Sequence, residues 1–142
     1  MICRLLTVLT VFSGLLMSEA HADPAKAEAC LSELIQGAVA NGMRVRATDV
    51  DSGKPEEAVN YRVTLYKGNT YLLLGCADGD AVDLDLRLYN DKGEFIDGDK
   101  SPDPKPFVSV EPTITGEYAL QALVYKGPDA PTDFAVAIAF KP

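Results

Sequence analysis

Nine acidic side chains lie between residues 78 and 103, a segment that holds three basic ones. Carboxylate oxygens are hard ligands, and Ca²⁺ takes roughly six to eight oxygen ligands in tolerant geometry. The spacing of these acids matches no EF-hand loop, and a solvated acidic face is the alternative interpretation. The segment predicts a Ca²⁺ site, with no other cofactor, whose expected ligands are Asp83, Asp85 and Asp99, with Asp78 and Asp80 as further candidates.

The residues around Asp91-Lys92-Gly93 predict a β-hairpin. Apolar and polar residues alternate from Val82 to Tyr89, as in a half-buried strand, and a second strand begins at Phe95. Two carboxylates placed directly across from each other repel unless a cation or water lies between them. A three-residue loop with Gly93 in the left-handed conformation would place Leu88 beside Ile96, Arg87 opposite Asp97 and Asp85 opposite Asp99.

The residue types that many enzymes need are missing from most of the chain. The one His, His21, lies near the N-terminus, and there is no Trp. A mature chain that begins after His21 has no imidazole for Ser-His-Asp or Cys-His catalysis or for a zinc, copper or haem ligand. Asp83 and Asp85 share a face as a carboxylate pair, but a glycosidase would need a deep sugar cleft, which a domain of this size without Trp seldom builds. Asp97 and Asp99, which flank the hairpin, would be exposed with little to raise either pKa. We expect no enzymatic activity.

Met1–Ala22 has the pattern of a Sec-type signal peptide. Arg4 precedes an apolar run, and Ala20-His21-Ala22 is an A-x-A cleavage site, so the mature chain is predicted to begin at Asp23. The apolar run of about 13 residues is too short for a hydrocarbon core that needs roughly 20, so no membrane insertion is expected after cleavage near Ala22. The predicted location is the periplasm, with an extracellular protein as the alternative.

Two cysteines, Cys30 and Cys76, remain after residue 22. In an exported protein a lone pair of cysteines predicts a disulfide, because an oxidising compartment makes and keeps it. A reactive thiol is the alternative, and it would leave its partner unpaired. The chain-entropy argument assigns the bridge a stabilisation of about 4 kcal/mol.

The first mature element is predicted to be a helix that packs on the rest of the domain. Asp23 and Pro24 suit the N-cap and first helical positions, and Asn41-Gly42 suits the end. Since Cys30 lies on the apolar face, that face should point toward the strand that carries Cys76. The apolar residues recur at three- and four-residue spacing, and they are Ala27, Cys30, Leu31, Leu34, Ile35, Ala38 and Val39.

Short strands with Gly, Pro and Asn between them follow the helix, which predicts an antiparallel β-sandwich. Residues 70–77 and 118–125 are apolar on both faces and are expected to be central strands. In the last strand large apolar residues alternate with Ala135, Ala137 and Ala139, which suits close approach to a neighbour. The expected organisation is a signal peptide (1–22), a helix packed on the sandwich (23–43) and a sandwich domain (44–142). The expected strands cover residues 44–50, 59–66, 70–77, 82–89, 94–96, 107–111, 118–125 and 134–140.

Five motifs occur in order between about residues 60 and 140: Tyr61-Arg62-Val63-Thr64-Leu65, Val82–Tyr89 with Asp91-Lys92-Gly93, Asp99-Lys100-Ser101-Pro102-Asp103, Val108-Ser109-Val110-Glu111-Pro112 and Thr115-Gly116-Glu117-Tyr118. In this order they resemble the bacterial pre-peptidase C-terminal domain family. The resemblance implies a jelly-roll-like sandwich, usually appended to secreted proteases and often associated with calcium, substrate binding or secretion. Here a helix precedes the sandwich in place of a protease domain, which suggests a stand-alone version of the fold.

The formal net charge of −8 disfavours nucleic acid and anionic lipid as partners. Two functions remain. One is a non-catalytic exported binding or accessory domain that presents an acidic face, with or without Ca²⁺, to a protein or glycan. The alternative is a periplasmic inhibitor or chaperone-like protein that covers another exported protein with a loop or edge strand.

Overall fold

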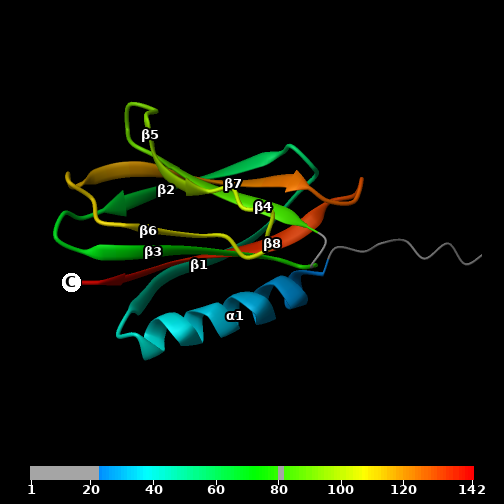
Figure 1. Ribbon diagram of the computed structural model, residues 1–142, viewed down its shortest axis with the longest axis horizontal. Helices are drawn as coiled ribbons and strands as arrows, with labels where there is room; N and C mark the ends of the chain where they lie inside the picture. Colours follow the sequence, from blue (N-terminus) through cyan, green and yellow to red (C-terminus); the bar gives the residue numbers. More distant parts are fainter. Residues whose placement is uncertain (1–22, 80–81) are drawn as a thin grey trace, which may run out of the picture.

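The computed structural model describes residues 23–79 and 82–142 (Figure 1). The predicted signal peptide and Asp80 lie outside these residues. Over the described ranges, no helix is both long enough and apolar enough to cross a membrane.

The predicted helix forms as α1, Pro24–Ala40. The side chain of Asp23 accepts a hydrogen bond from the backbone N–H of Lys26 (3.3 Å), so Asp23 is the N-cap. Asn41 is the C-cap, and Gly42 follows with a φ of +81°, a conformation that favours glycine. The prediction was wrong for Val39, which is 52% exposed.

Eight strands follow α1 and form two antiparallel sheets of four strands each. We name them sheet A, with the order β1-β8-β3-β6, and sheet B, with the order β2-β7-β4-β5. This interleaved order is that of a jelly roll, so the predicted fold class is confirmed. The strands are β1 (Arg44–Gly53), β2 (Ala58–Leu65), β3 (Thr70–Ala77), β4 (Asp83–Tyr89), β5 (Phe95–Asp99), β6 (Phe107–Val110), β7 (Gly116–Lys126) and β8 (Thr132–Lys141).

Alternating side chains of both sheets fill the space between them. The strands expected to be central are so: β3 lies between β8 and β6, and β7 lies between β2 and β4. Burial of such apolar side chains is the main stabilisation of a sandwich. The largest fully buried members of this core are Tyr71, Phe134, Leu65, Leu73, Leu84, Leu86, Leu88, Leu120 and Val124.

Helix α1 lies under sheet A, on the side away from sheet B (Figure 1). Ala135, Ala137 and Ala139 of β8 belong to the apolar cluster between α1 and sheet A, as their small size predicted. Cys30 of α1 is bonded to Cys76 of β3, which confirms the predicted disulfide. The helix is thus held to the sheet both by packing and covalently.

The β4–β5 register differs from the prediction. The turn forms as expected: Gly93 has a φ of +76°, and the backbone N–H of Asn90 donates to the carbonyl oxygen of Glu94 (2.9 Å). Beyond it, Tyr89 pairs with Phe95 and Leu88 with Asp97, so Ile96 is skipped as a β-bulge. The bulge shifts the pairing by one residue, and the predicted pairs Leu88–Ile96, Arg87–Asp97 and Asp85–Asp99 are wrong: Arg87 pairs with Gly98 and Leu86 with Asp99.

Candidate functional site

The acidic segment keeps two of its predicted ligands together on β4. Asp85 is only 3% exposed, and its Oδ2 accepts a hydrogen bond from Nη2 of Arg87 at 3.1 Å. Burial raises the pKa of Asp85, as do the charges of Asp83 and Asp99, while the Arg87 guanidinium opposes the rise. Oδ1 of Asp83 and Oδ1 of Asp85 are buried and accept no hydrogen bond from the described residues. These two oxygens are the part of the segment that suits a cation.

Asp99, the third predicted ligand, binds backbone N–H groups. Its carboxylate accepts hydrogen bonds from the backbone N–H groups of Ser101 (2.9 Å) and Phe107 (3.1 Å). Burial tends to raise the pKa of Asp99, but the hydrogen bonds from Ser101 and Phe107 outweigh it, and the pKa is lowered. Asp99 therefore organises the connection from β5 to β6.

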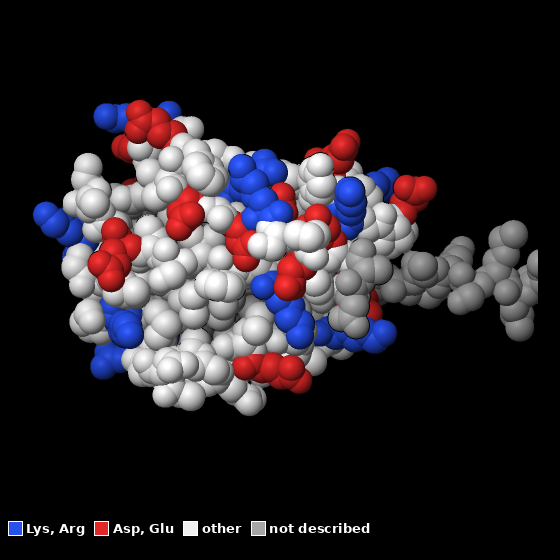
Figure 2. Space-filling view, viewed as in Figure 1, with Lys and Arg blue, Asp and Glu red and all other residues white. Residues whose placement is uncertain are grey.

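Asp78 lies apart from the other predicted ligands, at the start of α1. Its Oδ2 accepts hydrogen bonds from the backbone nitrogens of Asp23 (2.9 Å) and Asp133 (3.2 Å). In residues 23–79 and 82–142, no group of three or more His, Cys, Asp or Glu is placed to hold a metal ion. Calcium stays a prediction. On the face shown in Figure 2, Lys and Arg side chains lie among the acids, so no continuous acidic patch forms there.

A second feature, the loop between β6 and β7, was not singled out from the sequence. Ile114 in this loop is 70% exposed, the highest value for a large apolar side chain in the described chain. The loop is nevertheless held: the Tyr118 hydroxyl donates to the Ile114 carbonyl oxygen at 2.7 Å, and the Lys67 backbone N–H donates to Oγ1 of Thr115 at 2.8 Å. At its other end, the Thr70 hydroxyl donates to Oε1 of Glu111 (3.3 Å). The loop therefore presents an apolar tip on a fixed base.

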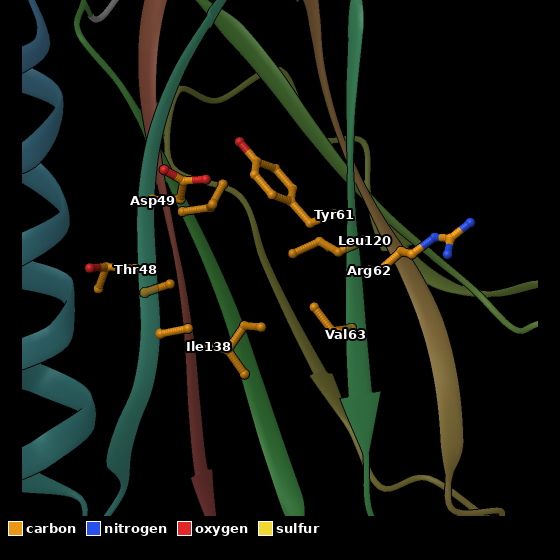
Figure 3. Close-up of a pocket in the computed structure, with 10 residues that line it drawn as sticks. Thr48, Asp49, Tyr61, Arg62, Val63, Leu120 and Ile138 are labelled. Atoms are coloured by element: carbon orange, nitrogen blue, oxygen red, sulfur yellow. The ribbon is translucent and has the colours of Figure 1, made fainter.

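A third feature is an apolar hollow of about 190 Å³ between β1 and β2. These strands are the edges of sheets A and B on the same side of the sandwich. We call this hollow the β1–β2 slot. Ile138 and Val63 face each other across it, and Asp49 and Tyr61 reach toward each other at its upper end in Figure 3. The side chains that line the slot include Ala47, Asp49, Tyr61, Val63, Leu120 and Ile138.

Tyr61 gives the slot a polar end. Its hydroxyl donates to Oδ2 of Asp51 at 3.4 Å. Burial raises the pKa of Tyr61 above its ordinary value, and the negative charges of Asp51 and Asp49 raise it further. The phenol is therefore a neutral hydrogen-bond donor at physiological pH. Sequence reasoning missed this site because the first strand was expected to end at Val50, whereas β1 continues to Gly53.

The strand order and layers define a jelly-roll β-sandwich in which a disulfide attaches a helix to one sheet. No protein-family model matches the chain, and no curated protein sequence matches it. The resemblance to the pre-peptidase C-terminal domain family stays a prediction. Among solved structures, Aeromonas hydrophila PliG, a periplasmic lysozyme inhibitor of g-type lysozyme, is similar. The TM-score is 0.52 at 12% identity, over 71% of this chain and 90% of that chain. At this identity the likeness concerns the fold.

Proposed function

We propose that this protein is an exported inhibitor that binds another exported protein, with a lysozyme as the first partner to test. The observation that carries the proposal is the fold likeness to PliG, which extends over 90% of a periplasmic lysozyme inhibitor. The likeness favours the inhibitor alternative over an accessory domain that works through bound calcium. The disulfide between Cys30 and Cys76 fits a protein that works outside the cytoplasm.

The charge of the chain supports a cationic partner. A net charge of −8 attracts a positively charged protein and speeds its association at low ionic strength. It also repels other acidic proteins, which contributes to specificity. Binding should therefore weaken as salt is added, mainly through a slower association rate.

The β6–β7 loop supports an inhibitor that inserts an anchor. A fixed loop loses little conformational freedom on binding, so more of its contact energy appears as affinity. Ile114 stands exposed at its tip, while the Tyr118 hydroxyl and the Lys67 N–H hold the backbone beneath it. In the complex, Ile114 would enter a cleft of the enzyme and block the substrate.

The test is an inhibition assay with the mature protein and purified lysozymes, g-type first, together with calorimetry of the mixture. We expect stoichiometric loss of lytic activity at a 1:1 ratio. Ile114→Ser should weaken inhibition at least tenfold. Val39→Ser, which alters another exposed apolar side chain near the C-terminal end of α1, should leave inhibition unchanged. Full lytic activity with no heat of binding for every lysozyme type would overturn the proposal.

A further inference from the structure

The β1–β2 slot is an open apolar hollow at the edge of the sandwich, and its ends are closed by different contacts. At one end Nη1 of Arg46 donates to the carbonyl oxygen of Thr64 at 2.6 Å, which ties β1 to β2. At the other end the Tyr61 hydroxyl donates to Asp51. Between these two ties Val63, Leu120 and Ile138, which are themselves buried, form the apolar floor of the slot.

Two carboxylates occupy positions where a sandwich ordinarily places apolar side chains. Asp49 pairs with Val136 and Asp51 with Phe134, so both Asp residues lie at register positions of β1 that face sheet B. Inward-facing charges protect an edge strand against pairing with another chain. That role accounts for the charges, but it does not require the apolar hollow of about 190 Å³ beside them.

The part of the chain that the structure describes supplies no cation to these acids. The ion pairs within the described residues do not involve Asp49 or Asp51. Arg62, from β2, points away from the slot in Figure 3, and Arg46 is bonded to Thr64. An apolar floor with two carboxylates at one end is complementary to a group that is aliphatic along its length and cationic at its tip.

We propose that the β1–β2 slot binds an arginine or lysine side chain that a cationic partner protein presents, with the aliphatic stem on Val63, Leu120 and Ile138. The charged head then lies beside Asp49 and Asp51, where the Tyr61 oxygen is a further acceptor. A charge-assisted hydrogen bond to a carboxylate is stronger than a neutral one. The inference deepens the proposed function. It rests on that function only for the identity of the protein that presents the side chain, because an acidic inhibitor attracts a cationic protein.

The test uses N-acetyl-arginine N-methylamide as the probe, added at millimolar concentration to the mature protein with NMR detection of methyl and aromatic signals. We expect saturable shifts at Val63, Ile138 and Tyr61. The citrulline analogue has the same shape and no charge, and we expect it to bind at least fivefold more weakly. An arginine probe that shifts none of these signals, or a citrulline probe that binds equally well, would overturn the inference.

Two variants test separately how the two carboxylates and the apolar hollow contribute to probe binding. Asp49→Asn with Asp51→Asn should remove binding of the arginine probe, whereas Asp91→Asn with Asp97→Asn, at exposed positions of the β4–β5 hairpin, should not. Ala47→Leu places a larger side chain opposite Ile138 and should block the slot while both acids remain. If Ala47→Leu folds and binds the probe as tightly as the parent, the side chain does not enter the slot and the inference is wrong.

The lysozyme assay distinguishes this inference from the proposed function. Probe binding without inhibition of any lysozyme would reject the lysozyme partner and retain the slot as a site for a different cationic protein. The opposite result would be a parent protein that does not bind the probe, together with an Asp49→Asn, Asp51→Asn variant that inhibits as well as the parent. That result would reject the slot and retain the inhibitor function.

Discussion

The backbone nitrogen of Asp23 lies 2.9 Å from Oδ2 of Asp78, and this contact joins the start of α1 to the end of β3. The same carboxylate oxygen accepts a hydrogen bond from the backbone N–H of Asp133 at 3.2 Å, so one side chain ties α1, β3 and β8 together. If signal cleavage leaves Asp23 as the first residue, the nitrogen that contacts Asp78 becomes an α-ammonium group. The neutral hydrogen bond is then replaced by a charge-assisted one.

We expect a protein that begins at Asp23 to be more stable than one that retains Ala22. The difference should be about 1 kcal/mol at pH 6, because the retained residue replaces the ammonium with a neutral amide. A free α-amino group loses its proton above about pH 8, so the difference should shrink at pH 10. Thermal melts of the two proteins measure it.

Asp78→Asn is the control for this pair, since it removes the anion and should bring the two N-terminal forms to the same melting temperature. Equal melting temperatures of the parent forms at pH 6 would show that the α-ammonium does not contact Asp78.

The disulfide should account for a large part of the stability. It closes a separation of 46 residues between Cys30 and Cys76, for which the chain-entropy argument gives about 4 kcal/mol. Cys30→Ala with Cys76→Ala should lower the free energy of unfolding by a few kcal/mol, measured by denaturant titration. Mass spectrometry after alkylation without reductant should find no free thiol at either position. Two alkylated cysteines in the exported protein would contradict the bridge.

The fold could be predicted from the sequence and the candidate sites could not, and one physical reason explains both outcomes. Alternation of apolar residues such as Phe134, Val136 and Ile138 reports burial directly, so the central strands and the helix-facing alanines could be predicted. A β-bulge leaves no comparable pattern: nothing in the residues around Ile96 indicates that it is skipped, although that single residue moves Asp99 from Asp85 to Leu86.

The β1–β2 slot and the β6–β7 loop could not be predicted from the sequence for a related reason. Asp49 and Asp51 face sheet B from an edge strand, where a polar residue in the sequence is ordinarily taken to face water. Ile114 is an apolar residue that the fold leaves outside, in a loop whose backbone is fixed by Tyr118 and Lys67. The side on which Asp49 and Asp51 lie and the exposure of Ile114 both follow from the fold, and only the structure shows them.

Asp99 should contribute stability through its two backbone hydrogen bonds. In Asp99→Asn one N–H donor, of Ser101 or Phe107, faces an NH₂ group, so we expect a loss of about 1–2 kcal/mol at pH 7. Because the folded-state pKa of Asp99 is lowered, this contribution is present above the ordinary pKa of the carboxyl and is lost as the pH falls through the lowered value. Denaturant titrations at pH 7 and at pH 2 measure the difference. Asp91→Asn, in the exposed turn, is the control and should cost little at either pH.

Calcium binding by the acidic segment has a direct test in the melting temperature. Oδ1 of Asp83 and Oδ1 of Asp85 are buried and receive no hydrogen bond from the described residues, so a cation between them would relieve two carboxylate oxygens. A ligand that binds only the folded state raises its melting temperature by mass action. We expect millimolar Ca²⁺ to raise the melting temperature over that in EDTA, and Mg²⁺ to raise it less, because Mg²⁺ demands a stricter geometry. Asp83→Asn removes one ligand without disturbing the Asp85–Arg87 pair and should abolish the response, whereas Asp91→Asn should keep it. Melting curves of the parent that coincide in Ca²⁺ and in EDTA would rule out a calcium site and leave Asp85 paired with Arg87.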